Sequence, residues 1–223
     1  MRDPYLNKYG ILTNKLGIDT DHKKLMQAEA DICFLKLINI DSLKVICFDK
    51  NLIKQIHKHI FEDIYPWAGE FRVTPLFKEE LVLPGYSIPY SDPEEIDNDL
   101  DKKLTELNSI AWQNMTTSEI AYTYARKIAL IWKVHPFRDG NTRTMLSFSF
   151  LYAKEHGFPF DMKTFTDGLN RQYFENGAVS KYSIRDKIVL ACLDEKDYPE
   201  IEHLANIFEE AINNYEEKSI KHK

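Results

Sequence analysis

Apolar residues recur at helical spacing along most of the chain, which predicts a mainly helical protein. Stripes of this kind run through residues 25–35 and 52–61, where apolar side chains return every three or four positions. Asp19 or Asp21 precedes the first stripe and Asp49 precedes the second, and an aspartate in that place caps the free amides of a helix. Both stripes therefore indicate helices with one buried face.

Helical patterns continue through the rest of the chain. The stretch 116–135 is apolar on several faces, so we expect it to form a central helix. Gly157 marks the expected end of the helix after it. The further helices are expected over residues 93–110, Asn141–His156, 164–182, 184–194 and 197–216.

The segment 72–90 differs from the helices around it. It is rich in β-branched and aromatic residues and contains Pro75, Pro84 and Pro89, which argue against a central strand. We expect an extended flap or an irregular hairpin, so the predicted fold class is all-α, a helical bundle with a small β-hairpin flap. The expected organisation is an N-terminal helical region over 1–48, a core over 49–182 that carries the flap, and C-terminal helices over 183–223 packed on the core.

Composition narrows the function classes. With 29 Lys+Arg against 35 Asp+Glu the formal net charge is −6, which argues against binding nucleic acid through bulk positive charge. Cys33, Cys47 and Cys192 are scattered and form no C-x-x-C pair, so we expect reduced thiols in or near the core. No apolar run is long enough for a membrane span, and the first residues do not resemble a signal peptide. We therefore expect a cytoplasmic protein, with delivery into a host cell left open.

The stretch 134–144, VHPFRDGNTRT, gathers residues suited to phosphate chemistry. One helix ends here and Gly140–Asn141 opens another, whose first amides and partial positive charge favour a phosphate. Arg143 adds a forked donor, and Asp139 is an oxygen ligand of the kind that Mg²⁺ takes together with substrate phosphates. His135 titrates near neutrality and is suited to act as a base. The combination indicates a nucleotide phosphate-transfer site.

The same stretch resembles the signature of the Fic (filamentation induced by cAMP) family, H-x-F-x-D/E-G-N-G-R-x-x-R. Residues Ile56–Arg72 are similar to the family's helix that leads into the flap, and the resemblance extends over about residues 9–182. The N-terminal part is similar to the antitoxin-regulated toxin and host-injected effector branches. Six motif positions match in place: His135, Phe137, Asp139, Gly140, Asn141 and Arg143.

The resemblance implies an all-α fold and an enzyme activity. Fic enzymes mostly transfer AMP from ATP to a Ser, Thr or Tyr hydroxyl of a target protein and release pyrophosphate. In this chain His135 would then deprotonate the hydroxyl, and Asp139 would hold Mg²⁺ against the phosphates of ATP.

The resemblance also implies which residues bind the phosphates. Backbone amides of Gly140–Thr142 would stabilise charge on the α-phosphate, with help from the Asn141 side chain. Arg143 would hold the distal phosphates, and Phe137 would anchor the loop in the core. Lys78 lies where the flap could also reach phosphate.

A target protein is expected to dock along the flap, adding an extended segment to its exposed edge. Neither nucleic acid nor a membrane is expected as a direct partner. Many Fic proteins are silenced by a helix with the pattern S/T-x-x-x-E-G/N, and this chain has no such sequence. Either a separate small antitoxin protein supplies that helix or inhibition of this type is absent.

Two positions depart from the family signature. Thr142 replaces the second glycine, and Leu146 replaces the final arginine, which in the family helps to orient the γ-phosphate. Thr142 is compatible with helical angles, so its amide remains able to bind the α-phosphate. The loss of the arginine leaves Arg143 alone to hold the distal phosphates. Two alternatives to an ATP-dependent adenylyltransferase stay open: a degenerate Fic fold that binds nucleotide or a partner without turnover, and transfer from another nucleotide donor.

Overall fold

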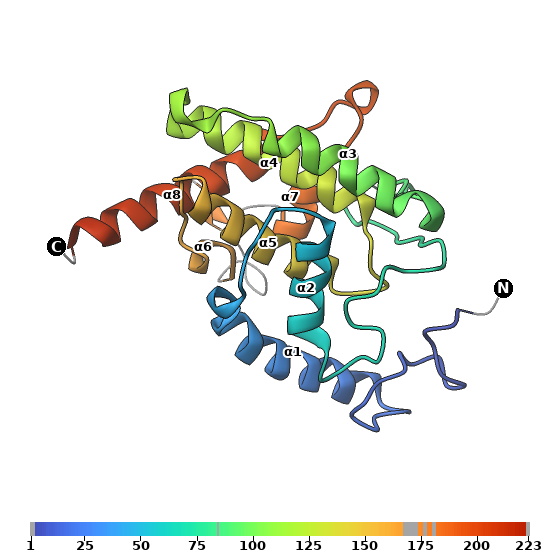
Figure 1. The fold of residues 1–223 in the computed structure, drawn as a ribbon. Helices are drawn as coiled ribbons and strands as arrows, with labels where there is room; N and C mark the ends of the chain where they lie inside the picture. Colours follow the sequence, from blue (N-terminus) through green and yellow to red (C-terminus); the bar gives the residue numbers. More distant parts are fainter. Residues whose placement is uncertain (1–2, 84, 167–173, 176–177, 180–181, 222–223) are drawn as a thin grey trace.

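The computed structural model describes residues 3–83, 85–166, 174–175, 178–179 and 182–221, and its architecture is helical, as predicted (Figure 1). Short 3₁₀ turns occur at Ile40–Ser42, Pro93–Glu95, Trp112–Asn114 and Glu195–Asp197. The α-helices are α1 (His22–Ile38), α2 (Lys50–Phe61), α3 (Ile96–Asn108), α4 (Thr117–Val134), α5 (Asn141–Glu155), α6 (Lys163–Thr166), α7 (Ile184–Ala191) and α8 (Glu202–Lys221).

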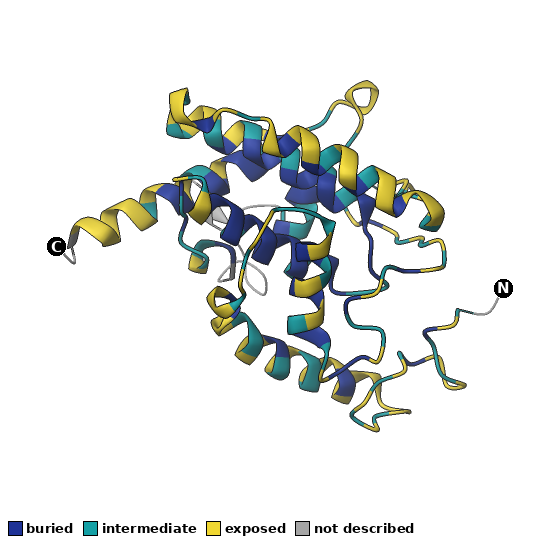
Figure 2. Ribbon diagram, in the orientation of Figure 1, coloured by how far each residue is buried: buried dark blue, intermediate teal, exposed yellow. Residues whose placement is uncertain are grey.

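Helix α4 forms the centre of the bundle, as its apolar faces predict. It packs against α3, α5, α7 and α8, while α2 packs against α5 and α1 packs against α2. Tyr124 and Trp132 of α4 are fully buried, and the ring of Tyr124 meets that of Phe208 on α8 at 5.1 Å. Figure 2 shows buried positions on the facing sides of α2, α4 and α5 and exposed ones along the outer faces of α1 and α3.

Aspartate caps set the first two helices, as the sequence predicts. The Asp21 carboxylate accepts the Lys24 amide at 3.0 Å, and that of Asp49 accepts the Leu52 amide at 3.0 Å. A cap of this kind contributes about 1 kcal/mol to stability. The caps thus fix where α1 and α2 begin, and with them the elements that lie beside the motif loop.

Residues 72–90, which we call the flap, run as an extended loop rather than as a β-hairpin. Among the described residues of this segment, strand-like pairing is limited to one antiparallel bridge between Glu79 and Ser87. Proline has no amide hydrogen to donate to the hydrogen bonds between two strands, which accounts for the absence of the predicted hairpin strands from the described residues of the flap. Several large apolar side chains of the flap are exposed: Val73, Phe77, Leu81 and Tyr86.

The expectations for residues 164–182, for the cysteines and for membrane spans are met to different extents. Of the helix expected over 164–182, the described residues contain α6, and where Phe174–Glu175 (β1) pairs antiparallel with Ala178–Val179 (β2) the expectation of a helix is wrong. The rest of that stretch up to residue 181 lies outside the described residues. Cys33 and Cys192 are buried free thiols, as expected, whereas Cys47 is exposed. Within the described part of the chain, none of the helices combines the length and the apolar character needed to cross a bilayer.

Candidate active site

The motif loop, residues 135–140, connects the end of α4 to the start of α5. His135 ends α4 in a left-handed conformation (φ 51°), and its amide donates to the Trp132 carbonyl at 3.0 Å. Pro136 then prevents the helix from continuing. Gly140 is also left-handed (φ 76°) and turns the chain into α5, whose N-terminus no side chain caps. The first amides of α5 are therefore available to a ligand.

Arg72, at the start of the flap, holds this loop in place. Its side chain is buried, its Nε donates to the His135 carbonyl at 2.8 Å, and its backbone amide donates to the Pro136 carbonyl at 2.8 Å. Its Nη1 donates to the Thr74 carbonyl at 2.8 Å, and its Nη2 donates to the Ser91 carbonyl. One guanidinium thus fixes both the left-handed turn and the two ends of the flap.

The His135 side chain is buried with its hydrogen-bonding capacity unused. Its exposed fraction is 0%, and among the described residues neither Nδ1 nor Nε2 has a hydrogen-bond partner. The ring of Tyr90 stacks on it with centroids 4.1 Å apart. Burial, followed by the charges of Lys78 and Arg185, holds the pKa of His135 well below its usual value, so the imidazole is neutral at pH 7. It is therefore able to accept a proton from a group that enters the pocket.

The Asn141 side chain is hydrogen-bonded to the backbone of the motif loop. Its Oδ1 accepts the Phe137 amide at 2.9 Å, and its Nδ2 donates to the Phe137 carbonyl at 2.8 Å. In this structure both side-chain groups of Asn141 are used by the loop, so its backbone amide is the group left to the pocket, and a part for the side chain in binding the α-phosphate stays a prediction. Phe137 is buried and stacks on His57 at 3.8 Å, which suits the anchoring role expected of it.

Arg143 is held by groups on α1 and α2. Its Nη2 lies 2.5 Å from Oε1 of Glu29, and its Nη1 donates to Sγ of Cys33 at 3.2 Å. Its guanidinium lies 4.7 Å from the centroid of the Phe61 ring, and the Tyr65 hydroxyl donates to the other oxygen of Glu29. A phosphate at Arg143 would share the arginine with Glu29, so this side chain is not the free donor that the motif suggests.

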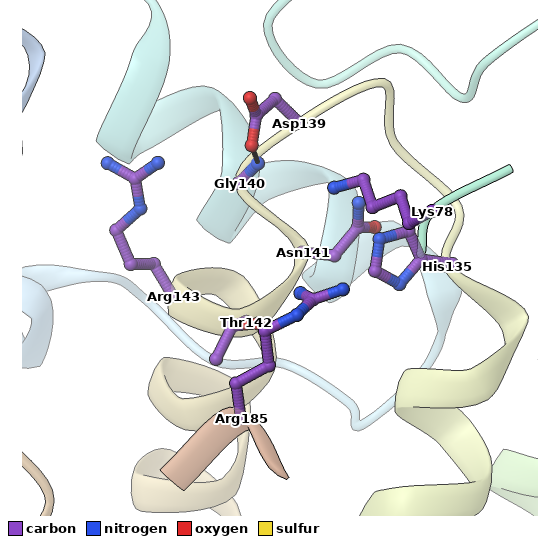
Figure 3. Close-up of a pocket in the computed structure, with 8 residues that line it drawn as sticks. All are labelled: Lys78, His135, Asp139, Gly140, Asn141, Thr142, Arg143 and Arg185. Carbon is purple, nitrogen blue, oxygen red and sulfur yellow. Dashed lines mark hydrogen bonds between the residues drawn. The ribbon is translucent and has the colours of Figure 1, made fainter. Parts of the chain in front are cut away.

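One pocket at the N-terminus of α5 brings together all seven expected site residues and adds Arg185 (Figure 3). Arg143 lies on one side of the helix end, and Lys78 and His135 lie on the other. Arg185 reaches from α7 toward His135. The residues that line the pocket are Lys78, His135, Asp139, Gly140, Asn141, Thr142, Arg143 and Arg185.

Thr142 and Asp139 are both fixed by local hydrogen bonds. Thr142 lies inside α5, as its helical angles allow, and its hydroxyl accepts the Trp132 indole N–H at 3.1 Å. The amide of Thr142 is among the first amides of α5, and its hydroxyl is held in place as an acceptor. Oδ1 of Asp139 accepts the Gly140 amide at 2.6 Å, which orients the carboxylate at the mouth of α5.

His57 supports the loop from α2. Its Nδ1 accepts the Gly69 amide at 2.8 Å, and its Nε2 donates to the Asp139 carbonyl at 3.1 Å. Only the neutral tautomer protonated at Nε2 makes both bonds. Burial lowers the pKa of His57 to about 3. His57 therefore holds the backbone that carries Asp139.

Replacing His57 by glutamine should flatten the pH dependence of stability. The unfolded chain binds a proton on His57 below pH 6.5, whereas the folded chain does not until about pH 3, so the free energy of unfolding falls as the pH drops through this window. His57 alone accounts for about 2 kcal/mol of loss between pH 7 and pH 5, and His135 adds a similar loss. Urea unfolding at pH 7, 6 and 5 should show His57→Gln losing about half as much as wild type, and an unchanged slope would contradict this role.

Three groups in or beside the pocket were not indicated by the sequence. Arg185 lines the pocket and pairs with Glu80, and Glu29 pairs with Arg143. These contacts are tertiary, and the three residues belong to no motif or periodic pattern. A signal did exist for His57 and Arg72, because both lie in the stretch 56–72 that resembles the family outside its motif.

Comparison with known proteins agrees with this geometry. Residues 47–153 match the family model described as Fic/DOC family. The chain carries a Fic/DOC family domain, and the resemblance expected from the motif is confirmed.

The relatives named adenylyltransferases are similar over much of this chain. Protein adenylyltransferase VbhT of Bartonella schoenbuchensis is 28% identical over 184 residues, which are 81% of this chain and 36% of that protein. The probable protein adenylyltransferase y4lH of Sinorhizobium fredii is 29% identical over 127 residues, 54% of this chain and 62% of that protein. The chain thus spans 36% and 62% of the length of these two relatives.

Solved structures share the fold. BepC, a VirB-translocated effector protein from Bartonella tribocorum crystallised with AMPPNP, superposes with a TM-score of 0.70 at 23% identity and covers 93% of this chain and 95% of its own. The N-terminal Fic domain of a Bep effector protein from Bartonella quintana, with bound ADP, gives 0.70 at 22% identity and covers 93% of each chain. At these identities the likeness establishes the fold.

Proposed function

We propose that this protein is an adenylyltransferase that moves AMP from ATP to a Ser, Thr or Tyr hydroxyl of a target protein and releases pyrophosphate. The observation that supports this most is the neutral, unpartnered His135 imidazole beside the uncapped N-terminus of α5, in a pocket that contains three cationic side chains. The names of the relatives, and the AMPPNP and ADP bound to two structural neighbours, support the same class of substrate.

The roles of the residues follow from their places in the pocket. His135 would accept the proton of the target hydroxyl as that oxygen attacks the α-phosphorus. The amides at the start of α5 would stabilise the negative charge that develops on the α-phosphate oxygens, since a helix N-terminus presents oriented donors and a partial positive charge. Lys78 and Arg143 would balance the remaining phosphate charge from opposite sides of the helix end.

Asp139 fits a magnesium ion that is held together with nucleotide phosphates. Such an ion commonly takes one or two protein carboxylates, and waters and substrate phosphates complete its coordination. The described residues contain no group of three or more His, Cys, Asp and Glu side chains placed to hold a metal by themselves, and Asp139 is the carboxylate that lines the pocket. Magnesium bound there would neutralise phosphate charge.

The flap is proposed to dock the target. It is extended, its pairing is limited in the described residues to one bridge, and its exposed apolar side chains Val73, Phe77, Leu81 and Tyr86 offer contacts to a partner segment. Addition of an extended peptide along such a segment uses main-chain hydrogen bonds for affinity and side-chain contacts for specificity. The target hydroxyl would be presented next to His135 in this way.

A second candidate function has its own observation. Leu146, at the position of the missing arginine, is 5% exposed and packs in the core, and Arg143 is paired with Glu29. A Fic fold with this weakened phosphate site would bind nucleotide without turnover.

Labelling reactions distinguish these functions. A cell lysate is incubated with the protein and ATP labelled at the α-phosphate or, separately, at the γ-phosphate. We expect a labelled protein band from the α-label only, resistant to excess unlabelled GTP, UTP or CTP. A band from the γ-label would mean phosphorylation and would contradict the proposal, and competition by another nucleotide would identify another donor. AMPPNP binding without any label would favour the non-turnover fold.

A further inference from the structure

Arg185 enters the pocket from α7, which lies outside the stretch matched by the family model. Its Nε and Nη2 lie 3.1 and 2.5 Å from the two carboxylate oxygens of Glu80, a flap residue that is 3% exposed. The Tyr90 hydroxyl donates to the same carboxylate at 2.8 Å. The guanidinium carbon of Arg185 lies 5.2 Å from the centroid of the Trp132 ring. Arg185 is thus oriented by a buried carboxylate and an aromatic face.

This arrangement leaves one end of the guanidinium unused. Arginine has five N–H donors, and the fork toward Glu80 occupies the edge made by Nε and Nη2. Nη1 makes no hydrogen bond to another described residue. Figure 3 shows the guanidinium directed from α7 toward His135, beside the start of α5. A free Arg edge at that place is suited to a phosphate oxygen.

The motif does not supply the pocket with a second arginine. The motif position that would supply one is Leu146, which packs in the core and does not line the pocket. Arg143 lies on the opposite side of the helix end and already pairs with Glu29. Arg185 and Lys78 are then the cations on the side where His135 lies.

We propose that Arg185 binds the nucleotide phosphate closest to His135, through its Nη1 edge, while Glu80 keeps the guanidinium oriented. The proposal rests on the nucleotide site of the proposed function, and it deepens that function by naming a second phosphate-binding arginine contributed by α7. The phosphate nearest to the base is the one that would be transferred, so Arg185 would contact the α-phosphate.

Binding of adenosine, AMP and AMPPNP, measured by calorimetry in the presence of magnesium, tests this assignment. Arg185→Gln should weaken AMP and AMPPNP by about ten- to a hundredfold, because a hydrogen-bonded charge is lost, and should leave adenosine unchanged. Arg185→Lys should recover part of the affinity, since a lysine keeps the charge but not the fork. Lys127→Gln, which removes a cation paired with Glu106 outside the pocket, is the matched control and should bind all three ligands as wild type does.

Each other result overturns the assignment. Equal losses for adenosine and AMP would mean that Arg185 acts only through the structure of the flap. Unchanged AMP affinity would mean that the phosphate binds away from Arg185. Tighter AMP binding by Arg185→Gln would mean that the pair between Arg185 and Glu80 obstructs the phosphate site. Thermal unfolding of the free variants, with Arg185→Lys as the milder change, separates misfolding from these outcomes. Because binding needs no transfer, wild-type protein that binds AMP but labels no target would contradict the proposed activity and not this assignment.

Discussion

Replacing His135 by alanine should lower the rate of AMP transfer about 10²–10⁴-fold, the range over which a positioned general base accelerates a proton transfer. The imidazole is buried, neutral and without a hydrogen-bond partner among the described residues, and the pocket's carboxylate, Asp139, is the residue proposed to hold magnesium. The backbone of His135, which Arg72 holds through the carbonyl, is kept by the substitution. Affinity for AMPPNP should therefore stay near that of wild type.

His59→Ala is the control that shows whether the loss of activity is specific to His135. His59→Ala removes a histidine of α2 whose Nε2 bonds the Lys36 carbonyl and which does not line the pocket. It should transfer AMP at close to the wild-type rate. Single-turnover transfer from α-labelled ATP to a purified target measures both variants. Equal rates for His135→Ala and wild type would contradict the assignment of His135 as the base.

The position of His135 also links catalysis to the flap. With 0% of its surface exposed and the Tyr90 ring stacked on it, His135 meets no solvent in this structure. The Tyr90 ring covers one face of the imidazole, and movement of that ring would expose this face to a target hydroxyl. Because Tyr90 and Glu80 are flap residues bonded to each other and to Arg185, a peptide docked on the flap as proposed would act on the contacts that hold the Tyr90 ring against the base.

The sequence predicted those helices whose positions depend on residues close together in the chain. Asp21 and Asp49 cap α1 and α2 because the cap and the apolar stripe are neighbours in the chain. The flap shows the limit of composition. Its β-branched and aromatic residues favour strands, but strand pairing needs a regular row of donors, and the prolines interrupt that row.

In the candidate site, too, the residues that are close in sequence could be predicted and those placed by tertiary packing could not. The motif loop could be predicted because its residues are consecutive, and the fold brings every one of the predicted site residues to one pocket. The positions of Glu29 beside Arg143 and of Arg185 in the pocket could not be predicted, since they depend on how α1 and α7 pack. The sequence also could not decide whether the Asn141 amide faces a phosphate or its own loop, because both uses need the same residue type at the same position.

Replacing Gly140 by alanine should have the largest effect on stability. Gly140 has a φ of 76°, and a Cβ atom built there lies 2.3 Å from Cε2 and Cζ of the Phe61 ring. The left-handed conformation costs a residue with a side chain about 1–2 kcal/mol, and forcing a methyl group against a buried ring costs about 1–3 kcal/mol more. The two together amount to about 2–5 kcal/mol, which lowers Tm by about 4–20 °C in a chain of this size.

Gly157→Ala separates the two costs. Gly157 is also left-handed (φ 86°), but a Cβ there meets nothing within 4 Å, so this variant should lose only the conformational part. Thermal unfolding of both variants gives the cost of the clash as their difference, and equal losses would rule the clash out. Phe61 also stacks beneath Arg143, so the ring displacement in Gly140→Ala should weaken AMPPNP binding as well, whereas Gly157→Ala should leave it unchanged. The same glycine thus serves the packing of α2 against the loop and the phosphate site that the loop carries.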